Sequence, residues 1–287
     1  MSKVFLALLD GMRPDALAVC NHPLFQELLS TSRYTMNMRT VMPSVTLPCH
    51  MSLFHSVSAD RHGILTNTYV PQVRPVNGIC EVLNGAGKTS AFFYSWEPLR
   101  DLARPLNLTR ASYYCGRSYG YDVADVKLAD DAERMFQSGE APDFVFFYQC
   151  QVDEMGHKYK WMSEEYFQSI RNSLDNVQRV IRQMPPDYHF ILTADHGGHD
   201  RSHGTENDTD MVIPMFLRHS TIAPGVISGD INIIDIAPTI AGILGVAPDP
   251  DWELKPPSDL LRAAGHITCI ANRCHFSRLL ILPFSIR

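Results

Sequence analysis

Short, strongly apolar runs that end at polar residues are the feature that most constrains the fold of this chain. The first of them, Lys3–Leu9, ends at Asp10. A run of this length that is apolar at nearly every position is typical of a strand buried on both faces of a parallel sheet. Four further runs repeat the design and predict four more strands: Thr89–Ser95, Asp143–Gln149, His189–Thr193 and Val212–Leu217.

Longer amphipathic stretches lie between these runs. Residues 163–184 have apolar side chains three or four positions apart and begin with Ser163, followed by two glutamates, as a capped helix does. Asp122–Phe136 and Asp235–Leu244 are further predicted helices. The alternation of strands and helices predicts an α/β fold with a mostly parallel sheet. Sites in such sheets gather at the carboxyl ends of the strands, and Asp10, Asp153 and Asp195 each follow a predicted strand.

Length and composition indicate one large domain. We expect a catalytic domain over residues 1–250, with small loop insertions near 66–78 and 96–121, where Pro, Tyr, Arg and Asn are frequent. The last part, 252–287, has five Lys or Arg residues against two Asp or Glu residues, whereas the whole chain has a net charge of −6. We therefore treat 251–287 as a C-terminal tail of uncertain role.

The net charge and the spacing of the cysteines indicate which partners and which cellular compartment to expect. The acidic net charge, without a basic stripe, argues against nucleic acid as a dedicated partner. No stretch reaches the roughly 20 apolar residues that span a membrane, and the first apolar run is short for a signal peptide. Seven cysteines without CxxC spacing indicate reduced thiols. We therefore expect a cytoplasmic protein with a small-molecule substrate and no membrane partner; nothing in the sequence indicates its oligomeric state.

Four segments each place an Asp, a His or a hydroxyl in a turn marked by Gly or Pro: LLDGMRPD (8–15), MPSVTLPCH (42–50), QCQVDEMGHKY (149–159) and TADHGGHDRSHG (193–204). Taken singly, Asp10 and Thr46 are residues that ordinary turns contain. Asp153 and His157 could form a local pair on a helix surface. Asp195 is a stronger signal, because a His and two glycines follow it directly. Together the segments offer the mixture of imidazole and carboxylate ligands that a two-zinc site needs.

The ordered motifs LDG-R-D, P-S-T-P-H, HGI-N, VDE-GH, ADHGG and HG resemble the alkaline phosphatase superfamily, and within it the nucleotide pyrophosphatase/phosphodiesterase branch. The resemblance extends from about Val4 to about Pro250. It implies an alkaline-phosphatase-like fold, in which a central sheet is sandwiched between helices. It also implies two metal sites: one formed by Asp10, Thr46, Asp195 and His196, the other by Asp153, His157 and His203.

The resemblance further implies roles for Thr46 and Asn67. Thr46 would be the nucleophile, and Asn67 would hydrogen-bond a nonbridging phosphoryl oxygen. A hydroxyl is a poor nucleophile near neutral pH, and metal coordination is one way to activate it. We expect Thr46 at the start of a helix, where exposed N–H groups favour a phosphate. The expected cofactors are two divalent ions, Zn²⁺ before Mn²⁺ or Fe²⁺. Attack by Thr46 would form a phospho-threonine that water then hydrolyses.

Several alternatives stay open from the sequence. The spacing around His199 does not by itself distinguish it from His203 as a ligand; the resemblance favours His203. The substrate expected is a nucleotide-like phosphodiester or pyrophosphate. No arginine is a clear counterpart for binding the extra negative charge of a monoester, although Arg13 or Arg39 could do so. A phosphomonoesterase or a phosphonoacetate hydrolase is the nearest rival. A sulfatase lacks support because the C/S-x-P-x-R motif is absent. A catalytically inactive metal-binding protein is the alternative from another class.

Overall fold

The computed structural model describes residues 2–253 and 260–261. Eight strands in this part of the chain form one sheet in the order β4-β3-β5-β1-β6-β7-β2-β8. The strands are β1 (Lys3–Leu9), β2 (Arg33–Arg39), β3 (Ser90–Tyr94), β4 (Arg110–Tyr113), β5 (Phe144–Gln149), β6 (Tyr188–Thr193), β7 (Val212–Arg218) and β8 (Gly225–Val226). The neighbours β3, β5, β1 and β6 run parallel, so their carboxyl ends lie along one edge of the sheet.

All five predicted strands form, and β1 shows why the apolar runs identify them. Leu8 of β1 is paired with Tyr148 of β5 on one side and with Thr193 of β6 on the other. The side chains from Val4 to Leu9 are completely buried. Helices cover both faces of a central strand in this position, so every side chain must be compatible with the core.

The structure refines the predicted mostly parallel sheet in one respect and corrects the prediction in another. First, β7 forms but runs antiparallel to both β6 and β2. An antiparallel neighbour needs no helical crossover, which fits the irregular stretch 194–207 between the two strands. Second, the segment near 96–121, expected as a loop insertion, contributes β4, which pairs in parallel with β3. Alternating exposure of β4 leaves it without a continuous apolar run, and the sequence pattern therefore does not mark it.

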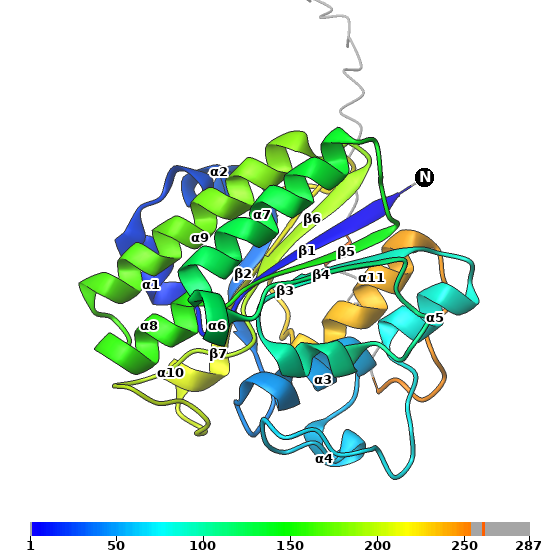
Figure 1. Cartoon of the computed structure of the whole chain (residues 1–287), viewed down its shortest axis with the longest axis horizontal. Coiled ribbons are helices and arrows are strands. Elements are labelled where there is room, and N and C mark those ends of the chain that lie inside the picture. Colours follow the sequence, from blue (N-terminus) through cyan, green and yellow to red (C-terminus); the bar gives the residue numbers. More distant parts are fainter. Residues whose placement is uncertain (1, 254–259, 262–287) are drawn as a thin grey trace, which may run out of the picture.

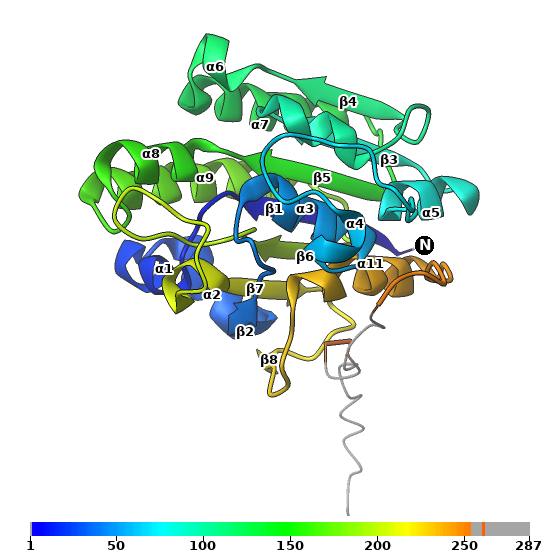
Figure 2. The ribbon, with the colours of Figure 1, turned by 90° about the horizontal axis from the view of Figure 1, so that it is seen from below.

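Helices lie on both faces of the sheet. They are α1 (Pro14–Cys20), α2 (Pro23–Thr31), α3 (Thr46–His55), α4 (Ala59–His62), α5 (Ile79–Gly85), α6 (Gly116–Tyr119), α7 (Tyr121–Gln137), α8 (Gln151–Tyr159), α9 (Glu164–Gln183), α10 (Asp208–Met211) and α11 (Ile236–Leu244), with the 3-10 helices η1 (Glu97–Leu102) and η2 (Ile233–Asp235). Figure 1 shows α1, α2, α7, α8 and α9 on one face and α3, α5 and α11 on the other. Figure 2 shows β4 and β8 at opposite edges. The predicted α/β sheet between helices is confirmed.

The three predicted helices are present as α7, α9 and α11. In α9 the hydroxyl of Ser163 accepts a hydrogen bond from the N–H of Tyr166 at 3.3 Å, which is the predicted N-cap. Its buried side chains include Ile170, Leu174 and Val177, at the spacing of one helix face. Because β1, β5 and β6 end at the same edge, α8 and the loop after β6 start there together, and this edge carries the site.

The remaining expectations concern loops, the tail and the cysteines. Residues 66–78 contain no helix or strand and connect α4 with α5. The predicted tail lies almost entirely outside the described residues. Within the described part of the chain, five cysteines are free of disulfides. No helix there is both long enough and apolar enough to cross a bilayer.

Candidate functional site

The three aspartates that follow predicted strands converge at the carboxyl edge of the sheet. Asp10 follows β1, Asp195 follows β6, and Asp153 lies in the first turn of α8, just after β5. Asp10 and Asp195 are completely buried, and Asp153 is partly buried. The chain therefore places three acidic side chains together at this edge of the sheet.

One group of possible ligands consists of Asp10, Asp195 and His196, whose ligand atoms lie within 4.8 Å of one another. His196 Nε2 is 3.3 Å from Asp10 Oδ1 and 3.4 Å from Asp195 Oδ2. Its Nδ1 is 2.8 Å from the carbonyl oxygen of Gly197, which fixes the proton on Nδ1. Nε2 is thus the ring nitrogen that faces the two carboxylate oxygens.

A second group consists of Asp153, His196 and His203, again within 4.8 Å. His157 was expected in this group; its Nε2 is 3.4 Å from Asp153 Oδ2. His203 Nε2 is 3.8 Å from Asp153 Oδ1. The Nδ1 atoms of His157 and His203 face backbone carbonyls, at 3.0 and 2.9 Å, so both present Nε2 to the aspartate. The two groups share His196, whose ring stacks on that of His203 at 3.9 Å.

Each of the three aspartates has one buried oxygen that contacts a histidine nitrogen but makes no hydrogen bond. Asp195 Oδ1 accepts hydrogen bonds from the N–H groups of Gly11 and His196, whereas its Oδ2 is buried without a partner. Asp10 Oδ2 accepts from the hydroxyl of Tyr148, and its Oδ1 has no partner. Asp153 Oδ1 is unpaired as well. Buried carboxylate oxygens are costly unless something compensates them.

Burial and mutual repulsion shift the pKa values in this cluster. Burial raises the pKa of Asp10 well above its usual value, and the charges of Asp195 and Asp153 raise it further. Burial also raises the pKa of Asp153, against the opposing effect of His196 and His157. For Asp195, the histidines outweigh burial and its pKa is lowered. The unpaired oxygens and the imidazole nitrogens together form a donor set that fits divalent cations.

His203 rather than His199 belongs to this cluster. His199 Nδ1 lies 2.7 Å from Asp210 Oδ1, and this pair is directed away from the ligand groups. Burial lowers the pKa of His203 to about 3. The ring therefore stays neutral, as a ligand must, over the whole physiological range.

Thr46 is the first residue of α3, as predicted. Its Oγ1 is 3.2 Å from His196 Nε2, on the side of the first ligand group. Asn67 comes from the loop between α4 and α5, and its Oδ1 accepts a hydrogen bond from the N–H of Leu47 at 2.9 Å. That contact fixes the amide plane and leaves Nδ2 free to donate to a ligand beside Thr46.

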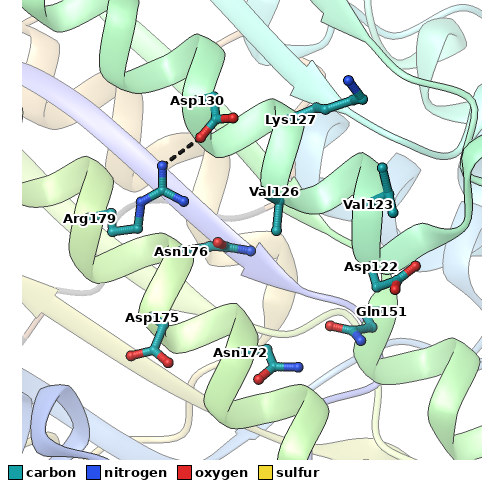
Figure 3. Close-up of a pocket in the computed structure, with 10 residues that line it drawn as sticks. All are labelled: Asp122, Val123, Val126, Lys127, Asp130, Gln151, Asn172, Asp175, Asn176 and Arg179. Atoms are coloured by element: carbon teal, nitrogen blue, oxygen red, sulfur yellow. Dashed lines mark hydrogen bonds and ion pairs between the residues drawn. The ribbon is translucent and has the colours of Figure 1, made fainter.

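Thr46, Asn67 and four of the candidate ligands, Asp10, Asp153, His157 and His203, line a small cavity of about 70 Å³, together with Trp96, Tyr121 and Glu154. None of its lining residues is Lys or Arg. A wider hollow of about 670 Å³ lies between α7 and α9 (Figure 3), and none of the predicted site residues lines it. Thr46, the predicted nucleophile, therefore lines the smaller cavity and not the wider hollow.

Sequence reasoning missed two residues that support this cavity. Tyr148, the penultimate residue of β5, donates its hydroxyl proton to Asp10. Its phenol in an otherwise apolar strand was the available signal. Asp125 of α7 accepts hydrogen bonds from the N–H groups of Cys150 and Gln151 at the start of α8, both at 2.9 Å. Nothing local in the sequence indicates that contact.

The chain is similar to several known proteins. Rat ectonucleotide pyrophosphatase/phosphodiesterase family member 1 is 24% identical over 217 residues, which cover 66% of this chain and 23% of that protein. The chain thus spans about a quarter of that relative's length. The solved structure of an inactive form of murine ectonucleotide pyrophosphatase/phosphodiesterase 5 in complex with AMP superimposes with a TM-score of 0.72 at 13% identity, covering 87% of this chain and 96% of that one. A phosphonate monoester hydrolase from Silicibacter pomeroyi gives 0.71 at 16% identity, with 91% and 76% covered.

At these identities the solved structures establish the shared fold. A family model identifies the family: residues 4–239 match the model described as type I phosphodiesterase / nucleotide pyrophosphatase. This span includes every residue of the two ligand groups, Thr46 and Asn67. The chain belongs to the type I phosphodiesterase / nucleotide pyrophosphatase family.

Proposed function

We propose that the chain hydrolyses phosphodiester or pyrophosphate bonds of a nucleotide-like substrate, with Thr46 as the nucleophile and two divalent metal ions as cofactors. The observation that carries this proposal is the position of the Thr46 hydroxyl. It lies at the start of α3, 3.2 Å from His196, the residue common to both ligand groups. Family membership supports the reaction class.

The ligand groups divide between two ions. Asp10, Asp195 and His196 would hold one ion together with the Thr46 oxygen, and Asp153, His157 and His203 would hold the other. When bound, such ions activate a hydroxyl and neutralise charge on a phosphoryl group. Three carboxylates and a threonine alkoxide balance the charge of two divalent ions. Zn²⁺ suits the mixed imidazole and carboxylate set, and Mn²⁺ and Fe²⁺ tolerate it.

The side chains of the cavity then have separate tasks. The Thr46 oxygen forms a bond to phosphorus while the bond from phosphorus to the leaving oxygen breaks, which gives a phospho-threonine that water hydrolyses. Asn67 Nδ2 donates to a nonbridging phosphoryl oxygen, since Leu47 holds its Oδ1. Trp96 and Tyr121 offer aromatic faces on which a nucleobase can stack. The AMP complex of the murine protein is consistent with such a substrate.

The small cavity itself is lined by no Lys or Arg, which favours a diester over a monoester, because a monoester carries one more negative charge. The cations Arg117 and Lys158 line the adjoining hollow, which shares Trp96 and Tyr121 with the cavity, rather than the cavity around Thr46. The guanidinium of Arg13 contacts Asp15 and the carbonyl of Gly198, and that of Arg39 contacts Asp208. Both arginines considered as anion-binding residues are therefore engaged elsewhere.

Turnover of four substrates tests the proposal: bis-p-nitrophenyl phosphate, p-nitrophenyl phosphate, phosphonoacetate and the p-nitrophenyl ester of a nucleoside 5′-monophosphate. We expect kcat/KM to be highest for the nucleotide ester and higher for the simple diester than for the monoester. A monoester preference of roughly tenfold or more would contradict the diester assignment. Metal binding without turnover of any of the four would identify the inactive metal-binding alternative.

A further inference from the structure

The indole of Trp161 is buried between two glycines that belong to the ligand-bearing segments. Trp161 follows α8 and is 5% exposed. A Cβ atom on Gly156 would lie 2.6 Å from the indole, and one on Gly198 would lie 2.2 Å from it. Neither glycine has a positive φ. Close approach of the ring, rather than backbone conformation, is what requires glycine at both positions.

These contacts reach all three strand ends of the site. Gly156 lies between Asp153 and His157 in α8, and Gly198 comes two residues after His196. The indole Nε1–H also donates to the carbonyl oxygen of Gly11, directly after Asp10, at 2.9 Å. One side chain therefore touches the segment after β1, the helix after β5 and the loop after β6.

The indole also packs against two of the proposed ligands. Its ring centroid is 5.1 Å from that of His157, nearly edge to face, and 5.9 Å from that of His203. Backbone carbonyls hold the Nδ1 atom of each histidine, at 3.0 and 2.9 Å. The hydrogen bond fixes one edge of each imidazole and the indole limits its rotation, so Nε2 stays directed at Asp153.

The backbone around Trp161 adopts an uncommon conformation. Lys160 has φ +89° and Met162 has φ +66°, both in the region that favours glycine. Conformations of this kind persist where surrounding contacts impose them. Here the N–H of Trp161 donates to the carbonyl of Asp200 at 2.8 Å, and the buried indole supplies the remaining contacts.

We propose that Trp161 is a positioning residue for the ion-binding group Asp153, His157 and His203. The indole sets the spacing between α8 and the loop after β6, and it thereby sets the affinity of this group for a divalent ion. The ring packs directly against His157 and His203, whereas its contacts near the first group, Asp10, Asp195 and His196, are with the neighbouring backbone of Gly11 and Gly198. The inference rests on the proposed function, because it concerns one of the two ions proposed there.

Zn²⁺ binding by the metal-free protein tests this role without an activity assay. We expect Trp161→Ala to weaken binding of one of the two ions by about 10- to 100-fold, the usual effect of removing an outer support, and to leave the other unchanged. Competition with a chelating indicator measures both affinities. Trp252→Ala is the matched control: Trp252 is also buried and its Nε1–H donates to the carbonyl of Asn77 at 2.8 Å, away from the ligands. It should lower the melting temperature and leave both zinc affinities intact.

Gly198→Ala provides a second, independent variant. The added methyl group must displace the indole, so this variant should show the same selective loss of one ion. In the Trp161→Ala background the methyl group enters the space that the indole has left. The double variant should therefore bind zinc no more weakly than Trp161→Ala alone. If Trp161→Ala does not fold, as judged by circular dichroism, Gly198→Ala alone decides the question.

Unchanged zinc binding in either single variant would overturn the inference, as would an equal loss from Gly198→Ala in both backgrounds. If the unaltered protein binds no zinc, manganese or iron, the proposed function fails first. Two ions in the unaltered protein with no effect of Trp161→Ala would defeat the positioning role and leave the proposed function standing.

Discussion

The hydroxyl of Thr46 is the residue-scale feature on which the proposed reaction depends. It combines a place at the first turn of α3 with a 3.2 Å contact to His196. We expect Thr46→Ala to lower turnover of a diester by at least about 10³-fold, because the variant has no oxygen to attack phosphorus. The carboxylates and histidines are untouched, so metal content should stay close to that of the unaltered protein. Kinetics and elemental analysis measure the two quantities.

Thr46→Ser is the matched control for this prediction. Serine keeps a hydroxyl at the same position, and much of the activity should return relative to Thr46→Ala. Unchanged turnover in Thr46→Ala would exclude Thr46 as the nucleophile. A loss of metal together with activity would instead show that the hydroxyl acts mainly as a ligand.

At the scale of elements, the start of α8 is held by a side chain of α7. The N–H groups at the start of a helix have no partner within the helix, and Asp125 accepts from two backbone N–H groups at this end. Its other oxygen accepts from the hydroxyl of Ser95, after β3. Asp125 thus connects α7, α8 and the end of β3 beneath Asp153. Burial raises its pKa to about 7, against the effect of these hydrogen bonds.

This raised pKa predicts how Asp125 affects stability. In the unfolded chain the carboxyl titrates near its usual value of about 4, so the folded state holds the proton more tightly between pH 4 and 7. The contribution of Asp125 to stability is therefore largest at low pH and is lost as the pH rises through 7. Asp125→Asn keeps an oxygen acceptor and cannot ionise. Relative to this variant, the unaltered protein should lose on the order of a few kcal/mol between pH 4 and 8.

Denaturant unfolding of metal-free protein at several pH values measures this difference. Comparing the two proteins at each pH cancels the titration of the other carboxylates, which both share. A stability difference that does not change with pH would show that the pKa of Asp125 is not raised in the folded state.

At the scale of the whole molecule, the buried aspartates couple folding to metal binding. Asp10, Asp153 and Asp195 each have a buried oxygen without a hydrogen-bond partner. The metal-free fold therefore contains repelling charges that an ion would neutralise. Adding Zn²⁺ should raise the melting temperature and chelation should lower it, because the ion binds the folded state preferentially.

Asp10→Asn separates the cost of burying the Asp10 charge in the metal-free fold from the stabilisation that a bound ion provides. Ionisation of Asp10 at pH 8 costs the folded protein free energy, as its raised pKa shows, and asparagine removes that cost. In the presence of EDTA the variant should melt at a higher temperature than the unaltered protein. With Zn²⁺ it should gain less, because one ligand charge is missing. A lower melting temperature in EDTA would contradict the view that Asp10 is destabilising without an ion.

Much of this molecule follows from local sequence. The run Lys3–Leu9 determines β1, because a strand with neighbours and helices on all sides must be apolar throughout. The spacing and the Ser163 cap determine α9. The motifs also place Asp10 and Asp195 correctly, since the end of a parallel strand is visible in the sequence as the end of its apolar run.

Tertiary structure decided what depends on contacts between distant residues. The antiparallel direction of β7 and the pairing of β4 follow from the neighbours that each strand finds, and neither strand's own residues specify them. Sequence spacing does not separate His203 from His199, but their contacts do: His203 faces Asp153, and His199 pairs with Asp210. The role of Trp161 is also decided by tertiary structure. Its indole donates to the carbonyl of Gly11, 150 positions away, and no local sequence pattern can encode a contact of that range.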